Sequence, residues 1–343
     1  PNGAVAIAGN EILAVGAKAD LLRSYSPKQS LDRPYAILLP GLINTHAHAS
    51  MSLLRGIADD QRLQDWLENY IFPAEARNVT KEFCYHGARL ACLEMLLSGT
   101  TTYADMYYFE EEVARATKDV GLRGVLGQTV IGFPVADAKA PQDALARCEL
   151  FMKQFANDPL ITPCVAPHAM YTNTRETLTA CRALANKYKT PLIIHLSETQ
   201  RENEDMRKNH GKSPTQILSD WGIFDGPTLA AHVIWVDDAD IKTLAAKGVG
   251  ISHCPSSNMK LASGVAPVTR QLAAGLHVGL GTDGPAGSNN DFNLFEEMDL
   301  APKLQKITLL DPTALPAPIV LEMATLQGAA SLGKAGKLGV LSQ

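Results

Sequence analysis

From Pro40 onward, short apolar segments alternate with longer segments of helical spacing, and this alternation constrains the fold more than any other feature of the chain. A short apolar run bounded by turn residues is typical of a buried strand, whereas apolar residues three and four apart are typical of a helix. Eight strands that alternate with helices favour an α/β fold, a (β/α)8 TIM-like barrel. The expected strands are Ile37–Thr45, Thr100–Met106, Gly124–Ile131, Ile161–Pro167, Leu192–His195, Thr228–His232, Val249–His253 and Val278–Gly281.

Helical segments lie between most of the expected strands. The clearest, Thr80–Ser98, carries Leu90, Leu93 and Leu97 at helical spacing and stops at Gly99, a residue that favours a helix end. An open doubly wound sheet is the alternative, but no glycine-rich phosphate loop follows any of the expected strands. The other expected helices are Thr215–Trp221, Asp238–Lys247, Ala266–Ala274 and Ala317–Leu332.

The overall composition is that of an ordinary globular protein. The chain has 343 residues, of which 46% are hydrophobic and 20% charged, and one α/β barrel can fill this length. A net charge of −5 gives no reason to expect nucleic acid or a membrane surface as a partner. The six cysteines contain no CxxC pair, which favours a reducing compartment, so we expect a cytoplasmic protein.

Several of the expected strands end in side chains that bind metals or transfer protons. His46 and His48 follow the first strand two residues apart, and side chains so spaced on a strand project to the same side. His195, His232 and Asp283 end the fifth, sixth and eighth strands. Because the chemistry of such barrels lies at the C-terminal ends of the strands, we expect these side chains to meet.

The pattern predicts one catalytic metal ion. Three neutral imidazoles and one carboxylate suit Zn²⁺ and leave room for a water molecule, whose pKa such a metal lowers to about 7, giving a hydroxide nucleophile. The expected ligands are His46, His48, His195 and Asp283.

Two further side chains are placed for proton transfer. His232 is expected to orient or deprotonate the attacking water, with Asp283 holding the proton of the same water. Glu198 lies three residues after His195 and can protonate a ring nitrogen and then pass a proton to a leaving amine.

Each of these residues also has a structural interpretation. Taken singly, His48 fits a core histidine, Asp283 fits a helix N-cap and Glu198 fits a surface charge. Taken together, in strand order and at strand ends, they favour the functional interpretation. His253, in Ser-His-Cys-Pro, is expected to support a ligand and not to bind the metal itself.

The chain resembles the amidohydrolase superfamily, and within it the 5-methylthioadenosine/S-adenosylhomocysteine deaminases most closely. The superfamily resemblance rests on four motifs: Pro40–His48, His195–Glu198, Ser252–Asn258 and Gly281–Gly284. The likeness to the deaminases rests on Gly281–Asp291 followed by Leu294–Met298, on Met259–Gly264, and on Trp66–Glu75.

The resemblance implies one zinc or iron ion per chain and the hydrolytic loss of ammonia from the adenine ring of a modified adenosine. It further implies that Glu75 binds the ribose hydroxyls, that Trp66 lines the nucleoside pocket, and that His168 contacts the substrate along with Glu198. The expected partners are a small purine nucleoside and further copies of the chain. The alternatives are a guanine deaminase, an s-triazine amino- or chlorohydrolase, and a non-catalytic relative that assembles with other proteins.

The chain departs from the family in two places. The family's small β-sandwich domain combines N-terminal strands with strands that follow the barrel, so residues 1–39 are expected to form its N-terminal part. Residues 40–330 form the catalytic barrel and residues 331–343 start a return to the sandwich that is cut short at Gln343, so both ends look trimmed. Members that accept S-adenosylhomocysteine use arginines after the third strand, where this chain has only Lys139, which favours a neutral 5′ substituent.

Overall fold

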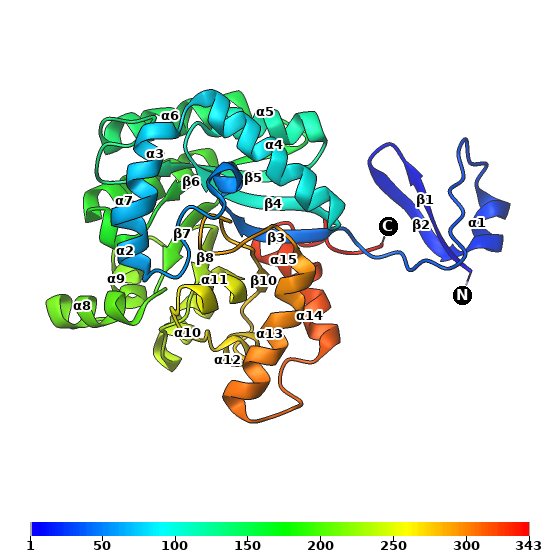
Figure 1. The fold of residues 1–343 in the computed structure, drawn as a ribbon. Helices are drawn as coiled ribbons and strands as arrows, with labels where there is room; N and C mark the ends of the chain where they lie inside the picture. The colour runs from blue at the N-terminus through cyan, green and yellow to red at the C-terminus, as the bar shows by residue number, and fades with distance from the viewer. Residues whose placement is uncertain (1, 343) are drawn as a thin grey trace.

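The structure is a computed structural model that describes residues 2–342, and its main feature is a closed barrel of eight parallel strands (Figure 1). Neighbouring strands follow chain order, and the last strand closes the barrel by pairing with both its predecessor and the first. The predicted TIM-like barrel is therefore confirmed. The strands are β3 (Leu42–Ala47), β4 (Thr100–Tyr107), β5 (Arg123–Val130), β6 (Ile161–Pro167), β7 (Leu192–Leu196), β8 (Thr228–His232), β9 (Gly250–His253) and β10 (Val278–Leu280).

The first barrel strand begins later than the sequence indicates. We predicted Ile37–Thr45, but β3 starts at Leu42, and Ile37 and Leu38 are exposed. Proline has no N–H to donate to a sheet, so Pro40 excludes the residues before it from the ladder. The Leu42 N–H is the first to pair, at 2.9 Å from the Gly99 carbonyl.

Helices cover the outside of the barrel, as Figure 1 shows. Thr80 caps the longest of them, α4, because its Oγ1 accepts the Phe83 N–H at 3.1 Å. The helix α13 (Leu294–Leu309) follows the last strand. The helices between the strands are η1 (Ala49–Leu54), α2 (Leu63–Asp65), η2 (Trp66–Ile71), α3 (Phe72–Asn78), α4 (Lys81–Leu97), α5 (Glu110–Val120), α6 (Pro141–Gln154), η3 (Met170–Thr172), α7 (Arg175–Tyr188), α8 (Gln200–His210), α9 (Pro214–Asp220), α10 (Asp238–Ala246), α11 (Pro255–Lys260) and α12 (Val268–Ala273).

The last expected helix, Ala317–Leu332, is two helices, α14 (Ala317–Met323) and α15 (Leu326–Ser331). Thr325 leaves helical geometry at φ −134° and ψ −92°, and its hydroxyl bonds back to the Leu321 carbonyl at 2.6 Å. The break frees the Ala324 carbonyl to accept the Ile43 N–H of β3 at 2.9 Å. A tertiary hydrogen bond to the barrel thus overrides the helical spacing.

The barrel interior is divided along its axis. Apolar side chains such as Ile43, Val125 and Ile193 form a cluster that Leu332 and Leu338 join from the chain's C-terminal segment. At the opposite, C-terminal ends of the strands the interior is polar: Asn44 bonds to Thr282 at 2.8 Å and ties β3 to the end of β10. This division leaves the functional site at the C-terminal ends.

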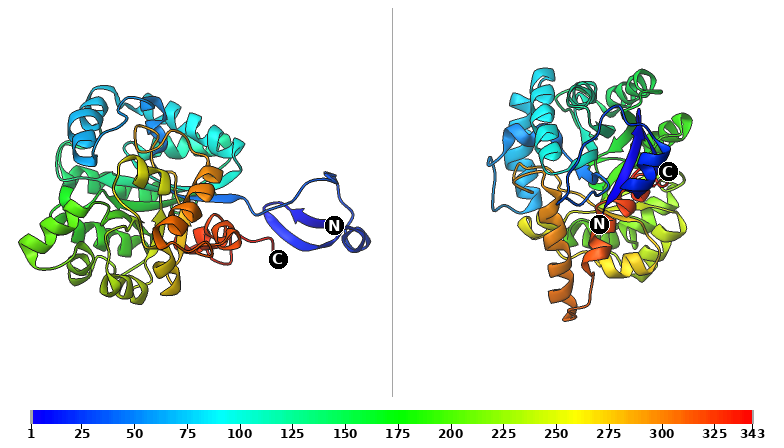
Figure 2. Two further views of the ribbon diagram at one scale, coloured as in Figure 1. Left: turned by 60° about the horizontal axis from the view of Figure 1, so that its bottom comes forward. Right: turned by 90° about the vertical axis from the view of Figure 1, so that its right-hand side faces the viewer.

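The N-terminal residues form a unit apart from the barrel. Strands β1 (Gly3–Ala8) and β2 (Glu11–Ala17) make an antiparallel hairpin, and α1 (Lys18–Ser24) follows them. Figure 2 shows this unit displaced from the barrel and connected to it by an extended stretch, residues 25–41. The division into residues 1–39, 40–330 and 331–343 remains our proposal. Between residues 2 and 342, no helix is both long enough and apolar enough to cross a membrane.

Candidate metal and active site

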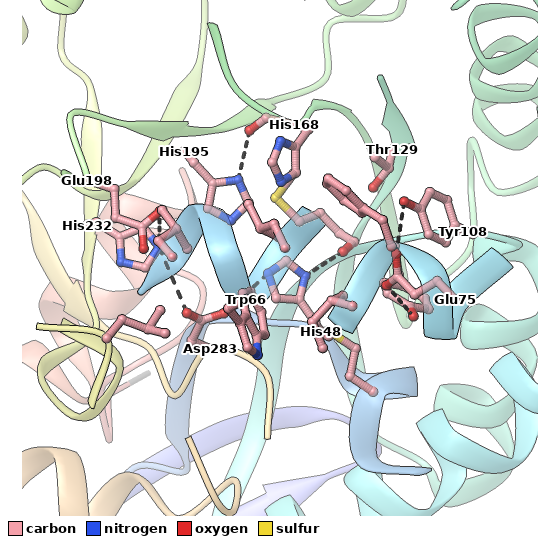
Figure 3. Close-up of a pocket in the computed structure, with 18 of the residues that line it drawn as sticks. His48, Trp66, Glu75, Tyr108, Thr129, His168, His195, Glu198, His232 and Asp283 are labelled. Atoms are coloured by element: carbon pink, nitrogen blue, oxygen red, sulfur yellow. Dashed lines mark hydrogen bonds and ion pairs between the residues drawn. The ribbon is translucent and has the colours of Figure 1, made fainter. Parts of the chain in front are cut away.

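The structure brings the side chains at the strand ends into one buried cluster (Figure 3). The His46 ring lies at the centre, with its centroid 4.8 Å from that of His48, 4.9 Å from that of His195 and 5.5 Å from that of His232. Asp283 closes the cluster, because its Oδ1 lies 3.5 Å from His46 Nε2 and 3.2 Å from His48 Nε2. Residues from β3, β7, β8 and the end of β10 therefore meet at one point.

Backbone carbonyls set the tautomer of two of these rings. His48 Nδ1 lies 2.8 Å from the Met106 carbonyl, and His195 Nδ1 lies 2.7 Å from the His168 carbonyl. A carbonyl only accepts hydrogen bonds, so each Nδ1 carries a proton and each Nε2 is the nitrogen that remains to bind a metal. Metal-binding histidines in proteins are held in this way.

The donor set fits a divalent metal ion. His46 Nε2 is fully buried and has no hydrogen-bond partner among the described residues, which is costly for a polar atom unless a ligand satisfies it. Burial lowers the pKa of His46 to about 4 and that of His195 well below its ordinary value, so both rings stay neutral, the form that binds metals.

His48 differs from its neighbours in its protonation. Burial opposes a charge on its ring, but the hydrogen bond to Asp283 and the negative charges of Asp283 and Asp105 outweigh burial and raise the pKa to about 9. Metal binding at this ring therefore displaces a proton, as metal binding to protein ligands generally does.

The donors form two overlapping groups. One is His46, His48 and Asp283, and the other is His46, His195 and His232, with the donor atoms of each group within 4.8 Å of one another. From the sequence we assigned His232 to the attacking water and not to the metal. The structure places its ring among the donors as well, and Asn258 Oδ1 accepts from its Nδ1 at 3.0 Å, so its Nε2 faces the cluster.

Glu198 lies beside this cluster, in the turn that follows β7. Its Oε2 is 3.9 Å from His232 Nε2, which is also 3.9 Å from Asp283 Oδ2. Burial raises the pKa of Glu198, an effect that the nearby Asp283 charge reinforces. The Asp283 carboxylate itself is held in place, because Ser257 Oγ donates to its Oδ2 at 2.7 Å.

The backbone is strained where these side chains emerge. Ser197, His232, Val233 and Asp283 all have positive φ angles, of 49°, 70°, 47° and 62°. Such angles are uncommon for residues other than glycine and are unfavourable above all for a β-branched residue such as valine. Strain of this kind concentrates at functional sites, where the surrounding structure holds it in place.

A small cavity of about 60 Å³ adjoins the cluster. Its apolar wall comes from the helical segment before α4 and includes Trp66, whose Nε1 donates to the Ala286 carbonyl at 2.7 Å. His168 lines another side, with its ring nitrogen 3.0 Å from Thr172 Oγ1, and burial lowers its pKa to about 3. Both residues were expected from the sequence to line the substrate pocket.

Glu75 is the polar group of the cavity that lies away from the cluster (Figure 3). The hydroxyl of Tyr107 donates to its Oε1 at 2.7 Å, and that of Tyr108 donates to its Oε2 at 3.3 Å. Burial raises the pKa of Glu75 to about 7, against the effect of these hydrogen bonds. Each carboxylate oxygen keeps one lone pair for a further donor.

Sequence reasoning overlooked these two tyrosines. Tyr107 and Tyr108 directly follow the expected strand Thr100–Met106, so the strand-end position that identified the histidines was also a signal for them. Asn258 and Ser257 belong to a motif that we noted without giving either residue a role.

His253 was expected to support a ligand. It is fully buried at the end of β9, and neither of its ring nitrogens has a hydrogen-bond partner within residues 2–342. In the structure, His253 therefore makes no side-chain hydrogen bond to any of the expected metal-binding residues.

Residues 55–78, here called the 55–78 segment, are held over the cavity by two contacts with other loops. Lys260 Nζ lies 3.1 Å from Asp59 Oδ1 and 3.1 Å from Asn290 Oδ1, so it bridges the segment and the loop after β10. Gly287 has a φ of 112°, and a Cβ at this position would strike the Ala58 carbonyl and the Trp66 indole. Only glycine allows the two loops to approach so closely.

Comparison with known proteins identifies similar sequences. Residues 37–343 match the model of the amidohydrolase family. A 5-methylthioadenosine/S-adenosylhomocysteine deaminase from Syntrophus aciditrophicus is 47% identical over 340 residues, which cover 99% of this chain and 76% of the relative.

Solved structures share the fold. An adenosine deaminase from Xanthomonas campestris with bound zinc superposes with a TM-score of 0.97 at 38% identity, covering 99% of this chain and 77% of that one. A guanine deaminase from C. acetobutylicum with guanine in its active site superposes with a TM-score of 0.89 at 25% identity, covering 99% and 83% of the two chains.

Proposed function

The chain belongs to the amidohydrolase family, and on this basis we propose that it is a metal-dependent deaminase of a modified adenosine, with 5′-methylthioadenosine as its favoured substrate. The products are the corresponding inosine analogue and ammonia. The observation that carries the proposal is the joint presence, in one cavity, of the histidine–aspartate cluster, the buried Glu198 and the tyrosine-held Glu75. The 47% identical relative is named as a deaminase of this class of nucleoside.

His46, His48, His195 and Asp283 would hold the metal ion, for which we propose Zn²⁺, since the adenosine deaminase of the same fold binds zinc. A divalent ion there would supply the Lewis acidity that activates a water for attack on the ring carbon bearing the amino group. Three of these residues are imidazoles and one is a carboxylate, the donor types that zinc prefers.

Glu198 and His232 would move the protons of the reaction. The raised pKa of Glu198 favours the protonated carboxyl, which would deliver its proton to a purine ring nitrogen. The same carboxylate can then take a proton from the attacking water and pass it to the leaving amine. His232 Nε2, close to both Glu198 and Asp283, would accept or orient the proton of that water.

Glu75 would position the nucleoside through its ribose. Its two oxygens, each bound by one tyrosine hydroxyl, can each accept one hydroxyl of a vicinal diol. The ring of Trp66 and the neighbouring apolar side chains would cover the rest of the nucleoside.

A neutral 5′ substituent suits the loop after β5 better than a zwitterionic one. Arg147 is the arginine nearest in sequence to this loop, and its guanidinium donates to both oxygens of Glu111 at 2.8 and 2.9 Å and to Asp137 at 3.2 Å. A guanidinium held by two carboxylates has little affinity left for the carboxylate of a homocysteine group.

An ammonia-release assay tests the proposal. The panel consists of methylthioadenosine, S-adenosylhomocysteine, adenosine, guanine and an aminotriazine, each with the metal-loaded protein. We expect methylthioadenosine to have the highest kcat/KM and Glu75→Ala to impair turnover of the nucleosides but not of the free base. Preference for guanine or the triazine, with Glu75→Ala neutral, would assign the chain to the alternative substrates.

A further inference from the structure

A second buried glutamate, Glu202, lies behind the turn that carries Glu198. It belongs to the first turn of α8, and it is buried although it does not line the cavity. Its Oε2 accepts the Glu198 N–H at 2.9 Å, whereas its Oε1 is buried with no hydrogen-bond partner among the described residues. The neighbouring N–H groups of Ser197 and Thr199 lower the pKa of Glu202, although burial raises it overall to about 8.

These amides come from a strained part of the backbone. Ser197 has a φ of 49°, and a residue other than glycine in this left-handed region costs about 1–3 kcal/mol. Successive N–H groups in such a turn form a concave site for an anion, so a carboxylate placed there stabilises the conformation that the turn would otherwise avoid. The turn sets the direction in which Glu198 leaves the backbone.

The same turn is hydrogen-bonded to the end of β8. The Leu196 carbonyl accepts the Val233 N–H at 3.0 Å, and the Ser197 carbonyl accepts the N–H groups of Ile234 at 3.1 Å and of Trp235 at 2.9 Å. His232 immediately precedes this stretch, so the backbones that carry both proton-transfer residues are fixed to one another.

We propose that Glu202 is a positioning residue, which acts on the reaction by holding the 197–199 turn so that the Glu198 carboxyl faces His232 and the substrate. This inference rests on the proposed function, because it assigns Glu202 a role through Glu198. Glu202 itself touches neither the cavity nor the metal donors, so it would act on the reaction only through the turn.

The decisive variant is Glu202→Gln, which keeps the size of the side chain but replaces the carboxyl group, whose Oε2 accepts the Glu198 N–H, with an amide that has a single, weaker acceptor oxygen. Loss of an outer partner of a catalytic group typically costs about 10–100-fold in activity, so we expect kcat to fall within this range. KM for methylthioadenosine and the bound metal content should stay within twofold of the unmodified protein. Glu204→Gln is the matched control, because Glu204 lies two residues on in the same helix with an exposed side chain.

A double-mutant cycle separates positioning from a general structural effect. In a Glu198→Gln background, Glu202→Gln should cost no further activity, because the group that it positions is already disabled. Equal losses in both backgrounds, or a kcat within twofold of the unmodified protein, would overturn the proposal.

Amide hydrogen exchange provides a test that needs no substrate. In Glu202→Gln the amides of residues 197–199 should exchange at least tenfold faster than in Glu204→Gln, and unchanged exchange would contradict the proposal. If Glu202→Gln folds poorly, Glu202→Asp, which keeps a carboxyl group on a shorter side chain, should show the same exchange effect in weaker form. Absence of any nucleoside turnover by the unmodified protein would refute the proposed function, whereas the exchange result concerns Glu202 alone.

Discussion

The Glu198 carboxyl lies in a position where the ionised form of a carboxyl group is energetically unfavourable. It is buried, it faces the negative charge of Asp283, and both effects raise its pKa. A raised pKa favours the protonated carboxyl, which can act as a general acid, whereas an amide in its place cannot.

Glu198→Gln should therefore retain the metal and lose most of the deaminase activity. Removal of a general acid–base typically lowers the rate by about 10²–10⁴-fold, and we expect kcat to fall within this range. Steady-state kinetics with methylthioadenosine, alongside metal analysis of the same preparation, provide the measurement. Near-normal turnover would mean that another residue carries the proton.

The variant His232→Asn tests whether the His232 ring binds the metal or only contacts the attacking water. We expect the variant to keep one metal ion per chain while kcat falls sharply, because the other four donors remain in place. Asparagine occupies a similar position but takes up no proton. Loss of stoichiometric metal in elemental analysis would show that His232 is a ligand.

The sequence predicted individual residues well where a strand end identifies them. The grouping of His46, His48, His195, His232 and Asp283 needed only the positions of four strands. The hydrogen bonds that orient these side chains could not be predicted from the sequence, because they are made by backbone carbonyls and by side chains far apart in sequence. The backbone carbonyls of Met106 and His168 orient two of the imidazoles. Every residue has such a carbonyl, so the residue type does not identify these two.

The 55–78 segment is the element that most affects access to the site. The cavity of about 60 Å³ is far smaller than the roughly 300–1,000 Å³ of most small-molecule pockets, so a nucleoside enters only when its walls move. Trp66 and Glu75 both lie on this segment, and Lys260 connects it to the loop after β10.

Lys260→Met should weaken this closed arrangement. A partly exposed ion pair contributes about 0.2–1 kcal/mol, so substrate association and product release should accelerate by up to about fivefold. Stopped-flow measurement of product release tests this expectation. Lys303→Met, which removes an exposed ion pair on α13, is the control, and equal rates in both variants would exclude a role for the Lys260 bridge.

Element boundaries were predicted less accurately than element types. Local sequence pattern identified every barrel strand. However, β3 begins only after Pro40, and the last expected helix is interrupted where the Ala324 carbonyl accepts the Ile43 N–H. The 55–78 segment shows the same limit, because its π-helix Trp66–Ile71 depends on loop contacts that only the folded chain creates.

At the scale of the whole molecule, the metal should contribute to stability as well as to activity. The donors come from β3, β7 and the end of β10, so an ion that binds them connects parts of the barrel distant in sequence. A ligand at 100 times its Kd stabilises the folded state by about 2.7 kcal/mol.

Removal of the metal with a chelator should therefore abolish turnover and lower the melting temperature by about 4 °C. Calorimetry before and after chelation tests this, with Zn²⁺ expected to restore both quantities and Mg²⁺ expected to restore neither, because Mg²⁺ favours oxygen ligands. A melting temperature that does not change would argue against a metal that spans the barrel.

The extended stretch between the N-terminal unit and the barrel makes the chain open to proteolysis at one place. Lys28 is exposed there and is followed by glutamine, whereas Arg33 is followed by a proline that resists trypsin. Brief trypsin treatment should therefore cut after Lys28 and release the hairpin while the barrel keeps its turnover, since no site residue precedes His46. Activity that declines in step with this cleavage would reveal that the hairpin supports the barrel in solution.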